Sequence, residues 1–482
     1  MQLFLASTFR YFLLVIPCFM LAGCNLASTP DHPNIILIMA DDLGWGDVGF
    51  NGNERIKTPF IDQLAAEGII WERFYAASAV CSPTRGSVLT GRHPTRLGIT
   101  HANTGHLHQE EITLAELLRD AGYATGHFGK WHLGTLTTLM RDSNRGQAGD
   151  SSHFSIPTMH GFDEYFATEA KVPTYDPMVK PIEFDTLNGE SLRYGWAAVE
   201  LKANESYGTR YWTNPDTPED ASLSGANSKV IMDRVLPFIE KSRTADKPFF
   251  SVIWFHTPHL PVVADSQHRA MYQGLSHQEQ IYYGTITAMD EQIGRLWAYL
   301  EAQKIADNTI LWFASDNGPE DHTPGSAGDF RERKRSLYEG GVRIPAFSIW
   351  REGYEGGRTI AVPAVTSDYL PTIVEMLGLR YPEAREVDGT SLAQVISGRQ
   401  TTRNKPIGFQ FQQKQSWVDD TYKLISTDAG QTYALYDLVS DPAEQSNIYD
   451  QHPERALKMR AELESWMSSI EKSREATERN GF

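Results

Sequence analysis

Two pairs of neighbouring oxygen-bearing side chains each follow directly on a short, largely apolar run. Asp41 and Asp42 come after the run NIILIMA, and Asp316 and Asn317 come after TILWFAS. Adjacent carboxylates repel one another unless a cation lies between them, and hard oxygen ligands suit Ca²⁺ or Mg²⁺ better than zinc. For either pair alone, the capping of a turn or helix is the more ordinary explanation. Together at one edge of a sheet, the two pairs favour a metal site.

A cysteine and an arginine stand four residues apart in the stretch CSPTR, from Cys81 to Arg85. The pattern predicts a short helix from Pro83 to about Thr90, ended by Gly91, because proline suits a first turn. The free N–H groups of such a helix start attract anions, and Arg85 would point back toward them. Cys81 would then meet an anionic target in a positive pocket. The alternative is a small buried cysteine beside an ordinary surface arginine.

Lysine and histidine residues follow two further apolar runs. Lys130 and His132 alternate, so they share one face if the segment is extended. His256 and His259 flank Pro258 in an irregular loop. A lone histidine is more often a satisfied structural residue than a catalytic one, and His256 is the one that we expect to support the site from outside it.

The formal net charge of −17 restricts the partners. A field of that sign argues against bulk attraction to nucleic acid or to anionic lipid. An anionic substrate therefore needs a local basic pocket that overcomes the global repulsion. The run RERKR at 331–335, which includes Lys334, is a local cluster that would supply one; the ordinary alternative is a solvated basic surface.

The elements that must carry these residues are strands of a parallel sheet. Four short apolar runs, each ending in a polar cluster, are typical of strands buried on both faces under a cover of helices. In such sheets ligands bind beyond the carboxyl ends of the strands. The runs are NIILIMA (34–40), YATGHF (123–128), FFSVIWF (249–255) and TILWFAS (309–315). We therefore expect an α/β fold in which the four strands deliver their polar residues to one shared site.

Helices are predicted between these strands, at 58–68 and at 113–122. From about residue 400 the pattern changes to short antiparallel strands and a terminal amphipathic helix. We therefore divide the chain into a catalytic domain, 33–400, and a smaller α+β subdomain, 401–482. The segment from about 135 to 230 is rich in Gly, Pro and Tyr and is interpreted as irregular insertions that shape a substrate pocket.

The first 23 residues have the pattern of a lipoprotein signal peptide (1–23). Arg10 gives a positive start, and the apolar stretch 11–20 is too short to span a bilayer. Residues 21–24, LAGC, resemble a bacterial lipobox, which predicts cleavage before Cys24 and a lipid on its sulfur. Residues 24–32 would link this anchor to an exported protein, periplasmic or at the cell surface of a bacterium. The alternative is an ordinary signal peptide cut after a small residue.

Cys81 stands alone once the signal is removed. The chain has three cysteines; Cys18 leaves with the signal and Cys24 becomes the anchor. No partner is left for an intramolecular disulfide in an oxidising compartment. Cys81 is therefore either buried and inert, or its sulfur is used or removed.

The stretch CSPTRGSVLTG resembles the signature of type I sulfatases, the formylglycine-dependent family of the alkaline phosphatase superfamily. The blocks NIILIMADDLGWGDVG, GYATGHFGKWHLG, PHLP, ASDNGP and KRSLYEGGVRIP stand in that family's order, and YKLI and LYDLVSDPAEQSNI resemble its C-terminal subdomain. The resemblance covers essentially residues 33–470. It implies a large mixed, mostly parallel sheet sandwiched by helices, with a small C-terminal α+β subdomain that carries an antiparallel sheet.

The resemblance implies that a formylglycine-generating or equivalent maturation enzyme converts Cys81 to 3-oxoalanine (Cα-formylglycine). One hydroxyl of the aldehyde hydrate attacks sulfur, and the other expels the sulfate afterwards; a serine lacks this second hydroxyl. The implied metal is Ca²⁺, with Mg²⁺ the less favoured choice. Its implied ligands are oxygens of Asp41, Asp42, Asp316 and Asn317, of modified Cys81 and of the sulfate.

The side chains that the resemblance assigns to catalysis are Arg85, Lys130, His132, His259 and Lys334, besides Cys81. Arg85 and Lys130 steady the hydrate and the sulfate charge. His132 matches the residue that deprotonates the second hydroxyl. His259 matches the catalytic histidine, and Lys334 matches the lysine that contacts the sulfate and the leaving oxygen.

The implied function is removal of sulfate from a sulfated polysaccharide or oligosaccharide, such as an algal galactan or ulvan. The sugar would bind loops near 99–108, 135–230 and 260–275, where the sequence assigns no residue a role. Two alternatives stay open. One is a phosphonate or phosphodiester hydrolase of the same superfamily, and the other is a non-catalytic binding lipoprotein with an unmodified Cys81.

Overall fold

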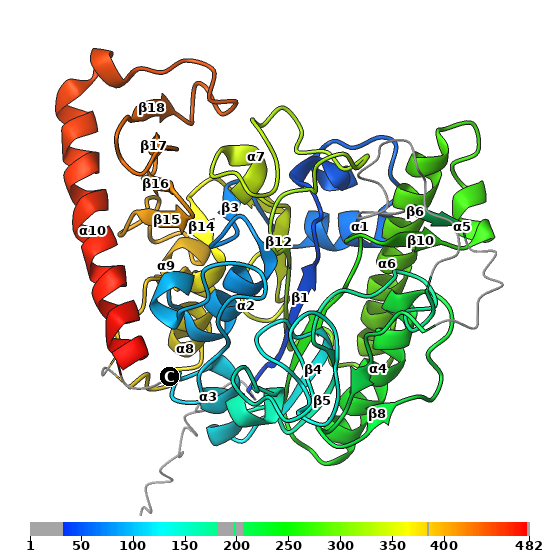
Figure 1. Cartoon of the computed structure of the whole chain (residues 1–482). Coiled ribbons are helices and arrows are strands. Elements are labelled where there is room, and N and C mark those ends of the chain that lie inside the picture. The colour runs from blue at the N-terminus through cyan, green and yellow to red at the C-terminus, as the bar shows by residue number, and fades with distance from the viewer. Residues whose placement is uncertain (1–31, 181–195, 199–205, 383–384, 480–482) are drawn as a thin grey trace, which may run out of the picture. The chain divides into compact units, whose positions relative to one another are not determined.

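The four apolar runs form adjacent strands of one ten-stranded sheet in the computed structural model of the chain (Figure 1). Every residue of the first of them is buried, as a strand covered on both faces requires. The structure describes residues 32–180, 196–198, 206–382 and 385–479. The four strands are β1 (Asn34–Ala40), β4 (Ala124–Lys130), β9 (Phe249–Trp254) and β11 (Thr309–Ser315).

The predicted signal peptide and Cys24 lie outside the described residues, as does the predicted linker except for His32. Within the part of the chain that is described, none of the helices is long and apolar enough to cross a bilayer. Residues Pro33–Phe482 form one folded unit.

Five strands in the middle of the sheet run parallel, and the antiparallel pairs lie outside them. The strand order is β13-β2-β12-β11-β1-β9-β4-β5-β7-β8. Strands β11, β1, β9, β4 and β5 are parallel neighbours, whereas β12 is antiparallel to β11 and β2, and β7 is antiparallel to β5 and β8. The expected large mixed, mostly parallel sheet is confirmed. The outer strands are β2 (Ile69–Trp71), β5 (Glu164–Thr168), β7 (Tyr211–Trp212), β8 (Pro218–Glu219), β12 (Ala346–Ile349) and β13 (Arg358–Ile360).

Helices cover both faces of this sheet (Figure 1). Ile35 and Leu37 of β1 belong to one core and Ile36 and Ile38 to another, because alternate residues of a strand point to opposite faces. The first core includes residues of α2 (Cys81–Thr90), α3 (Leu114–Asp120), α8 (Tyr369–Met376) and α9 (Ala393–Ile396). The second includes residues of α1 (Pro59–Glu67), α4 (Asn227–Thr244) and α6 (His277–Ala302).

The segment 135–230 is less irregular than predicted. Strand β5 lies within it and extends the parallel sheet beside β4, while β7 and β8 add two short antiparallel strands. Runs this short carry too little periodicity to be recognised in the sequence. The shorter elements elsewhere are β3 (Phe74–Tyr75) paired with β14 (Ala364–Val365), β6 (Trp196–Ala198) paired with β10 (Val262–Ala264), α5 (Ser266–Ala270) and α7 (Glu339–Val342).

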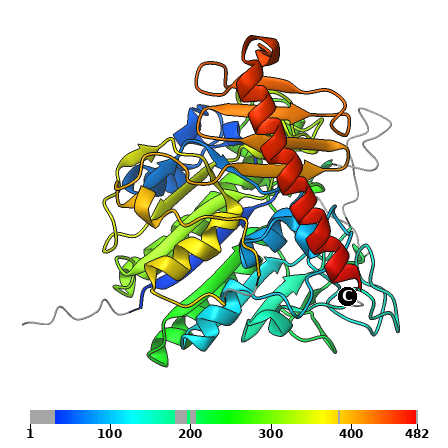
Figure 2. The same cartoon turned by 90° about the vertical axis from the view of Figure 1, so that its left-hand side faces the viewer.

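The C-terminal part is an antiparallel sheet covered by one long helix, α10 (Pro453–Arg479), which lies across the strands (Figure 2). Trp417 and Leu424 of the sheet pack on Leu463 and Ile470 of the helix. The other face of the sheet packs on Val80 and its neighbours, directly before α2. The expected C-terminal antiparallel sheet is confirmed. Its strands are β15 (Ile407–Phe411), β16 (Lys414–Val418), β17 (Tyr422–Ser426) and β18 (Ala434–Asp437).

Two lysines of the C-terminal sheet hold the segment between Arg335 and Glu339. The Nζ of Lys414 donates to the backbone carbonyl of Arg335 at 2.6 Å, and the Nζ of Lys423 donates to Oε1 of Glu339 at 3.0 Å. Oε1 of Glu444 also lies 3.0 Å from the Lys423 Nζ, and its Oε2 accepts the backbone N–H of Glu339. Both ends of the segment are therefore fixed from the C-terminal sheet.

Candidate active site

Polar residues from the ends of β1 and β11 form one buried acidic cluster. The backbone N–H of Asp42 donates to Oδ1 of Asp316 at 3.1 Å, and Nδ2 of Asn317 donates to Oδ1 of Asp42 at 2.7 Å. Burial raises the pKa of Asp42 and of Asp316. Oδ1 of Asp41 and Oδ1 of Asn317 are buried and have no hydrogen-bond partner. Such unfilled oxygen acceptors beside desolvated carboxylates fit a bound cation.

The donor set suits a hard divalent cation. Asp41, Asp42, Cys81 and His259 each bring one ligand atom, and these atoms lie within 4.8 Å of one another. Carboxylate and amide oxygens are the ligands that Ca²⁺ prefers in proteins. The oxygen ligands expected from the sequence therefore lie together, and His259 is an additional neighbour that the sequence did not suggest as a ligand.

Cys81 begins helix α2 beside this cluster. Its Sγ lies 4.0 Å from Oδ1 of Asp42, and the side chain is only 2% exposed. The helix starts two residues earlier than predicted and ends, as predicted, before Gly91, which has a φ of 68°. Burial, followed by the charge of Asp316, raises the pKa of the thiol well above its ordinary value. An unmodified Cys81 is therefore a protonated thiol, which is a poor nucleophile.

Arg85 and Lys130 are both fully buried and form ion pairs with the acidic cluster. Nη2 of Arg85 donates to Oδ2 of Asp316 at 2.6 Å, and Nη1 donates to the carbonyl of Lys130 at 3.0 Å. Nζ of Lys130 donates to Oδ2 of Asp41 at 2.7 Å. Burial alone would lower the pKa of Lys130, but the charge of Asp41 raises it, so the ammonium stays charged.

Lys334 comes from the predicted basic run and contacts the same cluster. Its Nζ donates to both carboxylate oxygens of Asp42, at 2.6 and 2.7 Å, and lies 3.5 Å from Oε2 of Glu320. Glu320 also accepts two hydrogen bonds from Arg335. Burial opposes the charge of Lys334, but Asp42 and Glu320 raise its pKa well above the ordinary value. Lys334 is thus part of the wall of the site, whereas Arg331 and Glu332 of the same run are exposed.

His132 has one ring nitrogen fixed and the other free. Its Nε2 lies 2.9 Å from Oδ1 of Asn103, and the same oxygen accepts from Nδ2 of Asn144 at 3.2 Å. Two donors on one oxygen place the proton of His132 on Nε2. Nδ1 is buried without a hydrogen-bond partner. Burial and then the charge of Lys130 lower the pKa of His132 well below its ordinary value, so the ring is neutral.

His259 and His256 occupy different environments. Nδ1 of His259 lies 2.5 Å from the carbonyl of Leu260 and donates to it, while Nε2 lies 3.6 Å from Oδ2 of Asp42. Nε2 of His256 instead pairs with the hydroxyl of Thr168 at 2.7 Å, in the buried interior. His259 therefore faces the cluster, and His256 lies behind it.

These side chains surround a pocket of about 260 Å³. Its lining includes Asn103, Asn144, Lys171 and Glu320, to which the sequence analysis assigns no role. Lys171 is partly buried in the loop that follows β5. Nothing in their local sequence marks these residues, because their position depends on how distant loops fold over the sheet edge. The full lining comprises Val80, Cys81, His101, Ala102, Asn103, Lys130, His132, Asn144, Ala170, Lys171, His259, Glu320, Lys334 and Arg335.

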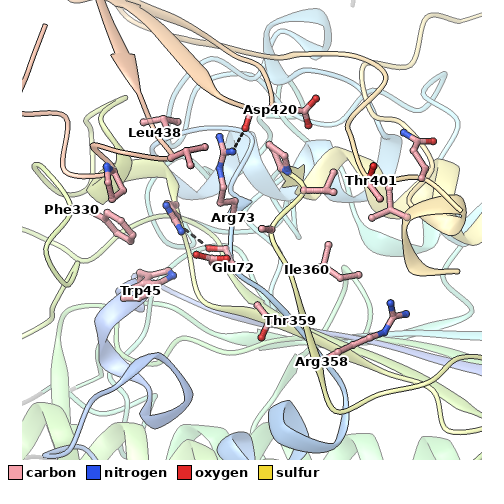
Figure 3. A pocket seen from close by; sticks show the side chains of 18 of the residues that line it. Trp45, Glu72, Arg73, Phe330, Arg358, Thr359, Ile360, Thr401, Asp420 and Leu438 are labelled. Atoms are coloured by element: carbon pink, nitrogen blue, oxygen red, sulfur yellow. Dashed lines mark hydrogen bonds between the residues drawn. The ribbon is translucent and has the colours of Figure 1, made fainter. Parts of the chain in front are cut away.

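A larger cavity, of about 770 Å³, lies between β13 and the C-terminal sheet (Figure 3). None of the described residues that line this cavity belongs to the site expected from the sequence. Its arginines are engaged with the backbone: Arg73 donates to the carbonyl of Asp420, and Arg358 donates to that of Ile396. The smaller pocket is therefore the one lined by the predicted catalytic side chains.

Comparisons with known proteins match nearly the whole folded part. A family model described as Sulfatase matches residues 33–379, and one described as N-sulphoglucosamine sulphohydrolase, C-terminal, matches 328–473. N-acetylgalactosamine-6-sulfatase of Canis lupus familiaris is 32% identical over 404 residues, which is 80% of this chain and 70% of that protein. Arylsulfatase G of Mus musculus is 31% identical over 397 residues, which is 76% of this chain and 69% of that protein.

Solved structures show the same fold. The crystal structure of Ps i-CgsB in complex with k-i-k-neocarrahexaose is 26% identical, with a TM-score of 0.76 over 90% of this chain and 93% of that one. Phosphonate monoester hydrolase of Agrobacterium radiobacter, at 19% identity and a TM-score of 0.63, covers 91% of this chain and 96% of its own, and shares the fold alone. Because the sulfatase model matches most of the sequence, the chain belongs to the sulfatase family, with its alkaline-phosphatase-like fold, and is a sulfuric ester hydrolase.

Proposed function

We propose that this protein removes sulfate from a sulfated carbohydrate, using a formylglycine made from Cys81 and a Ca²⁺ bound by the acidic cluster. The observation that carries the proposal is the position of Cys81, 4.0 Å from Asp42 at the base of a pocket walled by cationic and imidazole side chains. A carbohydrate is favoured because relatives include N-acetylgalactosamine-6-sulfatase and a structure bound to k-i-k-neocarrahexaose.

The cation would be held by Asp41, Asp42, Asp316 and Asn317, with Mg²⁺ as the less favoured choice. When bound it supplies positive charge for the oxygens of the sulfate and for the nucleophile. The formylglycine supplies two geminal hydroxyls, one to attack sulfur and one to release the sulfate. A formylglycine-generating or equivalent maturation enzyme is the partner that this requires.

The chain's own residues supply orientation, charge and proton transfer. Lys130 and Lys334 bring ammonium groups to the pocket, and the guanidinium of Arg85 neutralises Asp316 beneath it. Fixed cations in a dry site stabilise the charge that develops on the sulfate oxygens. The free Nδ1 of His132 is the acceptor for a hydroxyl proton. The proton for the departing alcohol would come from the charged ammonium of Lys334, or from His259 once Nε2 has itself taken up a proton, since Nδ1 already donates to Leu260.

Two measurements test this function. The tryptic peptide Phe74–Arg85 from native cells should have the mass of an aldehyde and not of a thiol at position 81. The purified enzyme should hydrolyse 4-nitrophenyl sulfate much faster than an aryl phosphodiester or phosphonate. A preference for the phosphorus esters makes the protein a phosphonate or phosphodiester hydrolase instead, because the two families share this fold. An unmodified thiol together with no turnover makes it a non-catalytic binding lipoprotein.

We also propose that the protein is exported and lipid-anchored to a bacterial membrane, periplasmic or at the cell surface. The support is the signal-like start of the chain and the sequence LAGC that ends at Cys24. Labelled palmitate should enter the wild-type protein in growing cells and not the Cys24→Ala variant. Equal labelling of both proteins would contradict the anchor.

A further inference from the structure

Lys171 stands apart from the other cations of the catalytic pocket. Each of those has a carboxylate partner: the pairs are Arg85–Asp316, Lys130–Asp41, Lys334–Asp42 and Arg335–Glu320. Lys171 lines the same pocket, yet among the described residues no carboxylate lies within ion-pair distance of it. The adjacent acid, Glu169, is engaged with Arg145 at 2.9 Å.

An unpaired ammonium in this position is unfavourable in the empty pocket. The side chain is partly buried, and Lys130 and Lys334, which have charges of the same sign, line the same pocket. Burial and then these two like charges lower the pKa of Lys171 below its ordinary value. An anion that enters the pocket relieves this repulsion, so the lysine is prepared for a negatively charged ligand.

The position of Lys171 in the fold points to an anion other than the sulfate that is cleaved. The acidic cluster, Cys81 and the paired cations gather around the ends of β1, β4 and β11, where the reacting sulfate belongs. Lys171 lies on the loop beyond β5, one strand further along the sheet, and it lines the pocket together with His259, which the proposed function places beside the leaving alcohol. Its neighbour in the substrate is therefore the sugar.

We propose that Lys171 binds a second anionic group, a sulfate or a carboxylate, on the sugar that carries the cleaved ester. The proposal rests on the proposed function and narrows its substrate class to carbohydrates with two acidic groups close together. One sulfate ester carries a single negative charge, which does not neutralise both a divalent cation at the acidic cluster and Lys171. A doubly charged sugar matches this distribution of charge.

The test compares matched pairs of ligands that differ by one acidic group. The pairs are N-acetyl-D-glucosamine 6-sulfate against D-glucosamine 2-N,6-O-disulfate, and D-galactose 6-sulfate against D-galactose 2,6-disulfate. Affinities are measured by calorimetry in the Cys81→Ser background, which prevents turnover. We expect that background to bind the doubly charged member of at least one pair on the order of 10-fold more tightly, a preference that shrinks as salt is added.

Three variants of the same background show whether Lys171 causes the preference. Lys171→Met should reduce the affinity ratio to about one, mainly by weakening the doubly charged ligand, whereas Lys171→Arg should keep it. Lys241→Met is the matched control, because Lys241 is exposed, forms an ion pair with Glu164 and does not line the pocket. We expect Lys171→Met to melt no lower than its parent, since it removes an unpaired cation.

The proposal is overturned if no pair is discriminated, if the preference survives in Lys171→Met, or if that variant weakens both members of a pair equally. The last result would mean that Lys171 holds the cleaved sulfate or merely shapes the pocket. Hydrolysis of 4-nitrophenyl sulfate by the wild type separates this proposal from the proposed function. A protein that does not turn over the ester but shows the Lys171-dependent preference loses only the proposed function.

Discussion

Replacing Asn103 tests how the pocket sets the protonation of His132. Oδ1 of Asn103 is the only group among the described residues that fixes the Nε2 proton, at 2.9 Å, and thereby leaves Nδ1 free to accept one. Asn103→Leu has a similar volume and removes this hydrogen bond. Because His132 is only 4% exposed, water does not readily replace the lost partner. A net hydrogen bond is worth about 0.5–1.5 kcal/mol, which corresponds to a rate loss of about 2- to 13-fold.

Asn103→Asp gives an effect of a different kind. A carboxylate beside the Nε2 proton stabilises the imidazolium and raises the pKa of His132, whereas the wild-type pKa is held well below its ordinary value. A base with a raised pKa is protonated near neutral pH, and its active, deprotonated form returns only as the pH rises. We therefore expect the Asn103→Asp enzyme to lose rate at low pH and to regain it at higher pH, where the wild type shows no such limb.

The assay is hydrolysis of 4-nitrophenyl sulfate over a series of pH values, with alcohol and sulfate release followed separately. If His132 acts in the release of sulfate, Asn103→Leu should show a burst of alcohol ahead of sulfate. Asn144→Leu is the matched control, since it removes the second donor to the same oxygen without touching His132, and should lose less rate. An Asn103→Leu enzyme with the wild-type rate, or an Asn103→Asp enzyme with the wild-type pH profile, contradicts the reasoning.

Three further outcomes are expected. Cys81→Ser should abolish turnover of 4-nitrophenyl sulfate while melting within about 2 °C of the wild type, because the two side chains are close in size; a much larger fall would make Cys81 a residue of the core only. Chelation should stop turnover and lower the melting temperature by about 3 °C, since a cation at about 100 times its Kd contributes about 2.7 kcal/mol spread over about 450 residues; a melting curve that ignores chelator argues against a metal site. Burial raises the pKa of Asp290, which accepts the backbone N–H groups of Phe60 and Ile61, to about 7. A raised carboxyl pKa contributes stability that is full below its unfolded value and is lost as the pH rises to 7, so urea unfolding of Asp290→Asn should vary less between pH 4 and 7, by at most about 1.4 kcal/mol per pH unit; an unchanged slope refutes this.

The framework of the site could be predicted because its information is local. A run such as NIILIMA is apolar on both faces and ends in two aspartates, so it identifies both a buried parallel strand and the edge where ligands bind. For this reason the structure brings Asp42, Asp316 and Asn317 into hydrogen-bond contact and places ligand atoms of Asp41 and Asp42 within 4.8 Å of each other. The same logic holds for Lys130, which is the last residue of β4.

The residues that the sequence did not reveal depend on tertiary folding. Asn103 has a φ of 64°, which asparagine adopts more readily than most residues, but nothing local shows that its side chain will meet His132. Lys171 is a single lysine in its stretch of sequence. What distinguishes it is that no carboxylate among the described residues forms an ion pair with it, and this is visible only in the folded structure. Helix α2 begins at Cys81 and not at Pro83, because Val80 packs on the C-terminal sheet directly before it.

The hydrogen bonds from Lys414 and Lys423 to the segment next to Lys334 connect one wall of the pocket to strands that are synthesised much later. A chain cut before Lys414 contains every strand of the central sheet and the whole acidic cluster, yet it lacks the two lysines that hold, from the C-terminal sheet, the loop that presents the ammonium of Lys334 to Asp42. We therefore expect truncated products to lack activity. Activity in this protein would then require that the C-terminal sheet has been synthesised and has packed against the catalytic part.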